Sequence, residues 1–392
     1  MIFKHEVVSP LNRGLLSLTY FFYFSLMGVF VSYVGIFLDD KGFSSEQIGI
    51  LIATVSLARI LGPNLWAGLA DKTGKLGLIL SGGSLLALII FLPVFYVEQF
   101  VAYVFVFAAM MMFWTAILPQ LEVSTVYACK DTRKGYGAVR LWGSIGFIVA
   151  SVIVGFLLDV YSSIIIVIGA CVSLFGLFLS TLTISTPNKV SHQHETKKSV
   201  LPLLLNKSFI AFLLANTLLQ ISFGSFYSFF SLYTQQLGYL GWQTGIFMAT
   251  GVFAEIFIFI YAVRLLKGFT VKRLLMLSLS LTTLRWLMLA FLAHHWWLIL
   301  LSQVLHAFSF GLTHSASIHY LHQNFSSEFQ SRAQAVYASV AFGVGGATGS
   351  YFAGIWWQNG ANPVMTFVYS AILAGLAFLS VLFMQSKENT PA

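Results

Sequence analysis

The side chains of this chain that could do chemistry are charged groups in apolar surroundings. Five of them lie deep inside long apolar runs: Arg59, Glu122, Arg140, Glu255 and Arg285. Glu255 lies in GVFAEIFIFIYAVRL, where no other charged residue occurs before Arg264. A carboxyl group kept away from water can take up and release a proton near neutral pH. This pattern predicts a path for protons or for a substrate, with Glu255 as a member.

Four histidines follow in QVLHAFSFGLTHSASIHYLHQ: His306, His314, His319 and His322. His306 and His314 are eight residues apart, which puts them roughly on one helix face and about 12 Å apart along the axis. That distance is too long for a shared metal ion but suits a polar pathway, so we assign His306 to proton relay or substrate binding. His319 and His322 fall near the predicted inner interface, where hydration accounts for them. We expect no metal site and no cofactor.

The composition indicates the solvent in which these residues lie. Of 392 residues, 58% are hydrophobic and 9% are charged, against about 25% charged in ordinary soluble domains. The mean hydropathy is +0.85, so the surrounding solvent must be lipid. The net charge of +8 is not gathered into a patch or stripe, which argues against a nucleic-acid partner. Cys129 and Cys171 form neither a disulfide framework nor a metal cluster.

The apolar runs predict an all-α membrane protein with twelve transmembrane helices in two pseudo-symmetric six-helix bundles. The predicted spans are Leu15–Leu38, Ile48–Ala70, Leu76–Val97, Phe100–Val126, Val139–Leu158, Ser162–Ile184, Phe209–Thr234, Gly241–Leu266, Val271–Ala293, Trp296–Tyr320, Ala333–Trp357 and Pro363–Met384. The first run is longer than the apolar region of a signal peptide, and no small-residue cleavage site follows it. We therefore expect it to remain as the first span.

The spans divide into two halves. Residues 1–184 are predicted to form an N-terminal six-helix bundle, and residues 208–392 a C-terminal one. The polar segment STPNKVSHQHETKKSVLP supplies a linker over residues 185–207. Ala138–Val139 recurs at Ala335–Val336 and Gly146 at Gly343, both 197 residues apart. Such a duplication places a binding site between the halves.

Basic residues indicate the orientation. With the N-terminus inside, Lys41 is the only Lys or Arg in the predicted outer loops, and the inner segments hold most of the others. This asymmetry places both termini in the cytoplasm. Tryptophans occupy the outer turns instead, as at Trp242 and Trp296, which fits an interfacial belt.

The buried charges have two interpretations. A charge facing lipid costs about 2.5–3.5 kcal/mol, so these side chains must face a cavity or one another. Glu122 and Arg140 share a depth near the inner face, where they are either a buried ion pair or part of a gate and transport path. Arg59 is placed near the midplane, where a guanidinium group could grip a substrate carboxylate through two hydrogen bonds or only neutralise a carboxylate of the other half. Arg285 is the second candidate for the substrate.

The loop GLADKTGK between the second and third spans resembles the loop motif of the major facilitator superfamily. Its matching residues are Asp71, Lys72, Gly74 and Lys75. The match departs at one point, because the small residue four before Asp71 is Ala67. The resemblance implies that this loop takes part in gating. The fifth span has no Gly-Pro pair of the kind found in many antiporters of the superfamily, which favours symport.

Within the superfamily, the chain is similar to the phenyl propionate permease family. The resemblance is carried by YGAVRLWGSIGF, AEIFIF, LRW, QVLH and QAVYASVA, and Glu122 stands where that family is expected to have aspartate. Lactose permeases are more distant relatives with a similar distribution of charges, which Glu122, Arg140, Glu255, Arg285 and His306 match by helix and residue type. The resemblance implies proton-coupled uptake, with Glu255, His306 and Glu122 in proton coupling and Arg59, Arg285 and Arg140 in substrate binding.

Together these observations predict a proton symporter of a bacterial cytoplasmic membrane that functions as a monomer. It would import a small organic solute, an aromatic monocarboxylate such as 3-phenylpropionate or cinnamate, by alternating access. The alternative within the same fold is a nucleoside or oligosaccharide symporter. A channel fits the duplication and the scattered charges less well. A membrane enzyme finds no support, because the sequence has no HExxH, paired catalytic carboxylates or nucleotide-binding loop.

Overall fold

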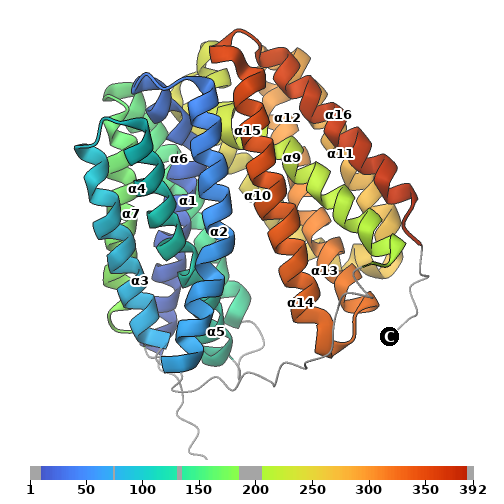
Figure 1. Ribbon diagram of the computed structural model, residues 1–392, viewed down its shortest axis with the longest axis horizontal. Coiled ribbons are helices and arrows are strands. Elements are labelled where there is room, and N and C mark those ends of the chain that lie inside the picture. Colours follow the sequence, from blue (N-terminus) through green and yellow to red (C-terminus); the bar gives the residue numbers. More distant parts are fainter. Residues whose placement is uncertain (1–9, 74–75, 130–134, 185–204, 386–392) are drawn as a thin grey trace, which may run out of the picture.

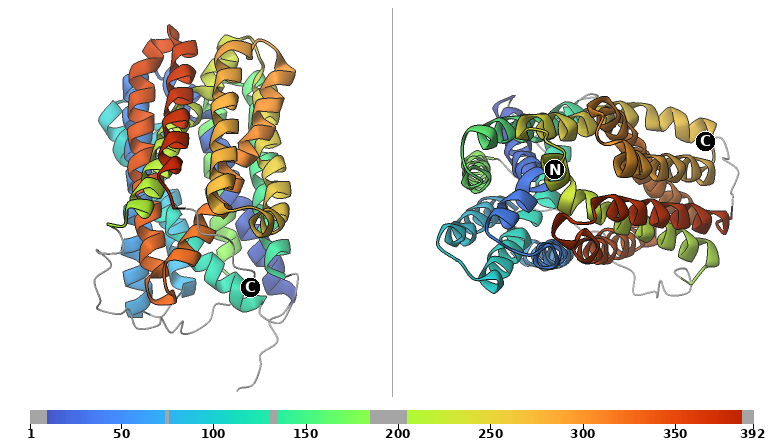
Figure 2. Two further views of the ribbon diagram at one scale, coloured as in Figure 1. Left: turned by 90° about the vertical axis from the view of Figure 1, so that its right-hand side faces the viewer. Right: turned by 90° about the horizontal axis from the view of Figure 1, so that it is seen from above.

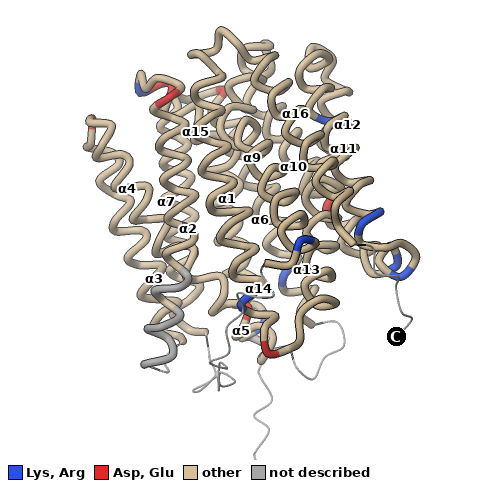
Figure 3. Tube along the Cα trace, turned by 45° about the vertical axis from the view of Figure 1, so that its right-hand side comes forward, with Lys and Arg blue, Asp and Glu red and all other residues tan. Residues whose placement is uncertain are grey.

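The computed structural model describes residues 10–73, 76–129, 135–184 and 205–385. Within these ranges the chain is helical and contains no strand. Eleven helical segments of the described chain are long and apolar enough to cross a membrane. Long stretches of these helices carry few charged residues (Figure 3). The predicted helical membrane fold is therefore confirmed.

The first half contains six membrane-crossing segments. They are built from α1 (Pro10–Asp40), α2 (Ser45–Thr73), α3 (Leu76–Phe91) with the 3-10 turn η1 (Leu92–Phe95), α4 (Phe100–Thr115) with α5 (Ile117–Ala128), α6 (Gly135–Val160) and α7 (Ile164–Thr181). A capping box begins α2, in which the Ser44 amide donates to Gln47 Oε1 and the Gln47 amide donates to Ser44 Oγ. Figure 1 shows these helices as one group.

The second half forms the other group (Figure 1). Its elements are α9 (Lys207–Gln236), α10 (Gly241–Gly268), α11 (Val271–Leu292), α12 (Trp296–Ala307), η2 (Phe308–Leu312), α13 (Thr313–Asn324), α14 (Ser327–Tyr337), η3 (Ala338–Gly345), α15 (Gly346–Trp357), η4 (Gln358–Gly360) and α16 (Pro363–Leu382). Most of the predicted linker, residues 185–204, lies outside the described residues. The predicted span Ala333–Trp357 is divided among α14, η3 and α15, because a π-helical stretch interrupts it. A π-helical stretch also interrupts the segment Trp296–Asn324, which is counted among the eleven all the same.

The two groups lie side by side (Figure 2) and pack through paired helices. α6 of the first half lies against α10, and α2 lies against α15. Glycines allow the backbones to approach at both places. A Cβ atom on Gly49 would lie 2.7 Å from the Ser350 carbonyl oxygen, and one on Gly245 would lie 2.5 Å from the Ser151 carbonyl oxygen. The two contacts are related by the internal duplication, since 196 residues separate Gly49 from Gly245 and 199 separate Ser151 from Ser350.

Glycines also allow close packing inside each half. A Cβ atom on Gly146 of α6 would lie 2.1 Å from the Phe21 carbonyl oxygen on α1, and one on Gly349 of α15 would lie 2.3 Å from the Ile221 carbonyl oxygen on α9. Gly343 faces Ile60 of α2 in the other half. The pairing of Gly146 with Gly343 at 197 residues remains a prediction from the sequence.

Two hydrogen-bonded clamps join the halves at one end of the molecule. Asp159, at the end of α6, accepts hydrogen bonds from the backbone amides of Gly241 (2.6 Å) and Trp242 (2.9 Å), the first residues of α10. Asn359 in η4 accepts one from the Ser45 amide at the start of α2 (2.7 Å), and its own amide donates to Ser45 Oγ (3.0 Å). We call this end the clamped end. The ribbons of the two groups approach each other here and diverge toward the opposite end (Figure 1).

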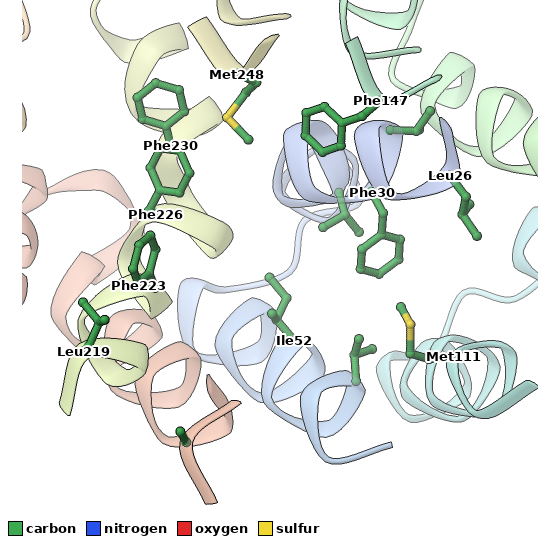
Figure 4. Close-up of a cluster of buried hydrophobic side chains, with 14 of the residues drawn as sticks. Leu26, Phe30, Ile52, Met111, Phe147, Leu219, Phe223, Phe226, Phe230 and Met248 are labelled. Carbon is green, nitrogen blue, oxygen red and sulfur yellow. The ribbon is translucent and has the colours of Figure 1, made fainter. Parts of the chain in front are cut away.

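Below the clamps, one hydrophobic cluster extends across both halves. Figure 4 shows Phe223, Phe226 and Phe230 of α9 on one side and Phe30 of α1 and Ile52 of α2 on the other. Of the candidate charged residues, Arg285 contacts Phe223 and Phe226 of this cluster, and Arg59 precedes Ile60, which meets Gly343 of the other half.

Candidate functional site

Glu255 and His306 lie in direct contact. Glu255 Oε1 of α10 is 2.9 Å from Nε2 of His306 in α12, and the two side chains are 14% and 10% exposed. A hydrogen bond fits this contact in two protonation states. Either the imidazole Nε2–H donates to the carboxylate, or the protonated carboxyl group donates to Nε2. The contact can therefore persist while the pair gains or loses a proton.

Gly251 brings these two helices together. It lies one turn before Glu255 on α10, and a Cβ atom there would be 3.3 Å from Cδ2 of the His306 ring. The absence of a side chain thus lets α12 approach α10 closely enough for the Glu255–His306 contact. The ring of His306 also packs between Phe223 and Phe310, with centroids 5.5 and 6.1 Å away.

Arg285 of α11 is fully buried in an aromatic box. Its guanidinium carbon lies 4.2 Å from the ring centroid of Trp286, 4.3 Å from that of Phe226 and 5.5 Å from that of Phe223. Such cation–π contacts stabilise a desolvated cation. Nη2 donates to Gln303 Oε1 (3.3 Å), whereas Nε and Nη1 have no hydrogen-bond partner in the described part of the chain. Two donors of a buried cation are therefore left without an acceptor.

Arg140 and Glu122 are neighbours but not an ion pair. Arg140 of α6 lies over the rings of Phe24 (4.1 Å) and Tyr20 (5.5 Å) on α1. Glu122 of α5 is close enough to interact with it electrostatically, yet no contact within 4.0 Å joins the two among the described residues. Both side chains are partly buried. Arg140 is thus stabilised mainly by aromatic faces, as Arg285 is in the other half.

Arg59 lies where the two halves meet. Its side chain is exposed and forms no hydrogen bond or ion pair with another described residue. The next residue, Ile60, contacts Gly343 of η3 in the second half. Arg59 is also within electrostatic range of Tyr23 on α1 and of Tyr227 on α9. Of the three candidate arginines, Arg59 is exposed, Arg140 is partly buried and Arg285 is buried.

Sequence reasoning missed two residues at this site. Tyr227 is partly buried, stacks on Phe223 (centroids 5.4 Å apart) and lies within electrostatic range of Glu255, Arg285 and Arg59. It therefore lies near charged groups of both halves. Gln303 lies in the stretch QVLH, but nothing in the sequence pattern indicates that its amide reaches Arg285. The signal available was a single amide in an apolar helix, three residues before His306.

The gating motif is only partly within the described structure. Asp71 and Lys72 fall in the last turn of α2, but their side chains lie outside the described part, as do Gly74 and Lys75 altogether. Their predicted role in gating therefore remains a prediction. Among the residues that the structure does describe, no group of three or more His, Cys, Asp or Glu side chains is placed to hold a metal ion.

The site thus combines a protonatable pair and a buried cation with free donors in the second half and, on α2, an exposed cation beside the boundary between the halves. This arrangement can bind an anion and exchange a proton. The described residues of the site do not pair a nucleophile with a general base, which a hydrolytic or transfer reaction would require.

Known proteins are similar to this chain in sequence and in fold. The MFS_1 like family matches residues 14–369. A probable 3-phenylpropionic acid transporter of Escherichia coli (strain K12) is 31% identical over 348 residues, which cover 88% of this chain and 90% of the relative. The maltose permease of Geobacillus stearothermophilus is 27% identical over 391 residues, covering 97% and 96%.

A solved structure confirms the architecture. The nucleoside transporter NupG aligns with a TM-score of 0.82 at 20% identity, over 95% of this chain and 99% of that one. At this identity the likeness shows the fold alone. The match of the family over residues 14–369 is what decides membership. The chain therefore belongs to the MFS_1 like family and is a transporter of the major facilitator type.

Proposed function

We propose that this transporter is a proton symporter that imports a small aromatic monocarboxylate, such as 3-phenylpropionate or cinnamate, by alternating access. The observation that carries the proposal is the Glu255–His306 contact of 2.9 Å beside the buried Arg285. A carboxyl–imidazole pair that keeps its hydrogen bond in two protonation states can carry one proton between the two sides of a membrane.

Arg59 is the proposed ligand of the substrate carboxylate. It is exposed at the boundary between the halves and has no acceptor in the described structure, so its five N–H donors are available for bidentate binding. The likeness to a probable 3-phenylpropionic acid transporter supports an aromatic acid as the cargo. The rings of Phe223, Phe226 and Tyr227 on α9 offer apolar faces for the aromatic part of such a substrate.

The other charged residues take supporting parts in the proposal. Arg285 is buried in its aromatic box, so it acts on the substrate through its charge and its two free donors rather than as an exposed ligand. Arg140 and Glu122 form the corresponding charged region of the first half, where Glu122 is a second group able to exchange a proton. The loop with Asp71, Lys72, Gly74 and Lys75 is proposed to gate the opposite end.

We further propose that the protein lies in the bacterial cytoplasmic membrane as a monomer with both termini in the cytoplasm. The asymmetry of Lys and Arg supports this orientation. The clamped end then faces outward, and the boundary between the halves is accessible from the cytoplasm. The conformation described here would be the one that releases cargo into the cell.

The test is uptake by purified protein in liposomes. An inside-alkaline pH gradient should drive accumulation of labelled 3-phenylpropionate or cinnamate by the natural protein. Glu255→Gln should abolish this accumulation but retain counterflow exchange within about threefold, because the amide keeps the shape of the side chain and cannot carry the proton. Accumulation that is unchanged in Glu255→Gln would remove Glu255 from the coupling path.

The same liposomes separate the alternative cargoes. The likeness to a maltose permease favours an oligosaccharide as the second candidate. A neutral sugar would leave the charge of Arg59 without a partner in the bound state, which is costly at a site closed to water. Competition by maltose or a nucleoside, with no competition by the aromatic acid, would refute the carboxylate assignment.

A further inference from the structure

We infer that Gln303 is a positioning residue that holds Arg285 away from Glu255 and thereby leaves Glu255 free to exchange its proton with His306. This inference rests on the proposed proton coupling and adds to it a residue that sets the pH range of transport. Gln303 is 1% exposed and lies on α12, three residues before His306.

The hydrogen bonds of Gln303 fix which way its amide points. Its Oε1 accepts from Arg285 Nη2 at 3.3 Å, and its Nε2 lies 3.2 Å from Ser302 Oγ. A guanidinium group only donates, so a rotated amide would set its N–H donors against those of Arg285. The acceptor oxygen of Gln303 must therefore face Arg285, and Nε2 of the same amide donates to Ser302 Oγ.

Without the Gln303 acceptor, the Arg285 guanidinium group would bind the nearby Glu255 carboxylate. Its Nε and Nη1 are buried and make no hydrogen bond in the described part of the chain. Glu255 is near enough to interact with it electrostatically, but the two form no ion pair within 4.0 Å among the described residues. A buried cation with free donors is attracted to a carboxylate more strongly than to a neutral amide. Gln303 and the aromatic box hold it back from that contact.

The consequence concerns protonation. A carboxyl group next to an arginine titrates about 1–3 pH units lower than an isolated one. If Arg285 paired directly with Glu255, the carboxylate would stay ionised and His306 would lose its partner. A neutral amide holds the cation in place without adding a second negative charge. Arg285 thus remains near Glu255 without forming a direct ion pair with it.

The titratable and charged groups within range of Glu255 lie on four elements of its own half, and α6, which also packs against α10, contributes none that the described structure shows. These groups are His306 on α12, Arg285 on α11, Tyr227 on α9 and His314 on α13. Arg285 is the only permanent cation of this set. Gln303 therefore affects the protonation of Glu255 by fixing the position of the Arg285 guanidinium group.

The test compares variants of Gln303 in liposomes. Gln303→Met has a similar length and removes the acceptor, so Arg285 should turn to Glu255. We expect the pH of half-maximal uptake to fall by about one unit or more and accumulation at neutral pH to fall at least about tenfold, with counterflow exchange retained. Gln303→Glu keeps acceptor oxygens on Arg285 and should not move the profile to lower pH. Ser309→Ala is the matched control, since Ser309 is buried and its hydroxyl donates to the Leu305 carbonyl oxygen one turn earlier.

A double-mutant cycle shows whether Gln303 acts through Arg285. In an Arg285→Gln background, Gln303→Met should cause no further shift of the pH profile. An unshifted profile in Gln303→Met, an acid shift in Gln303→Glu, or an equal shift with and without Arg285 would each overturn the inference. If Gln303→Met does not fold, the Gln303→Glu profile and its cycle with Arg285→Gln decide the matter. Failure of the natural protein to respond to a pH gradient would refute the proposed function instead.

Discussion

The clamp at Asp159 should set how readily the clamped end opens. Its carboxylate accepts two backbone hydrogen bonds, of 2.6 and 2.9 Å, from the first residues of α10. Hydrogen bonds to a charged group contribute about 1.5–3 kcal/mol, and a negative charge at a helix N-terminus adds about 0.3–1 kcal/mol. Asp159 is exposed, so solvent weakens both contributions. Replacing it by asparagine, which retains one acceptor, should cost the closed state about 1–2 kcal/mol, or roughly a 5- to 30-fold shift in population.

Thiol labelling measures that shift. A cysteine at Ser228 of α9, in a background without the native cysteines, would be buried at the boundary between the halves, because the Ser228 carbonyl oxygen lies against Gly35 of α1. Its rate of reaction with a maleimide should rise roughly 5- to 30-fold in Asp159→Asn, in proportion to the open population. Asp40→Asn is the matched control, since Asp40 bonds to Ser163 of its own half. An unchanged rate, or an equal rise in Asp40→Asn, would refute the idea that Asp159 holds the halves together.

Two further substitutions test the site itself. Arg59→Lys should weaken binding of the aromatic acid by about 10-fold or more, because lysine cannot reproduce a bidentate contact, and should leave binding of the neutral amide of that acid within about twofold. Calorimetry with both ligands measures the two affinities. Equal weakening of both would make Arg59 a structural residue. Gly251→Val should place methyl groups against the His306 ring, at a cost of about 1–3 kcal/mol, and separate His306 from Glu255. Proton-driven uptake should then fall roughly 5- to 100-fold, whereas Gly375→Val, at a helical glycine with open space around it, should have little effect; similar losses in both variants would contradict the role given to Gly251.

The sequence predicted the spans well because lipid imposes a simple rule on them. A helix must present apolar side chains over the thickness of the bilayer, so the hydropathy of consecutive residues is enough to locate a span. It does not reveal where a helix departs from α geometry. The π-helical stretches at Phe308–Leu312 and Ala338–Gly345 have ordinary apolar compositions. They depend on packing against neighbouring helices, which the composition of a single segment does not show.

The candidate charges were also found from the sequence, but their partners were not. A lone ionisable residue in an apolar run stands out by itself, whereas its partner is decided by the approach of helices far apart in sequence. Glu255 meets His306 because Gly251 lets α10 approach α12. Arg140 was considered as a possible ion-pair partner of Glu122, yet it lies over aromatic rings of α1. Opposite charges at similar depths do not by themselves imply contact.

The duplication offers a mechanism for the proposed coupling of proton and substrate. α2 begins at Ser45, which is held by the clamp at Asn359, and carries Arg59 14 residues later. α10 begins at Gly241, which is held by the clamp at Asp159, and carries Glu255, also 14 residues later. At 1.5 Å per residue, each charge lies about 21 Å from its clamp.

Arg59 and Glu255 therefore occupy equivalent depths in the two halves, one as a cation and the other as a protonatable acid. A substrate carboxylate bound at Arg59 brings a second negative charge toward Glu255, and two neighbouring carboxylates disfavour joint ionisation. Binding of the anion would thus favour binding of the proton. Because such coupling is reciprocal, protonation of Glu255 would strengthen binding of the anion by the same factor. Proton and substrate would then cross together, since each is bound most tightly when the other is present.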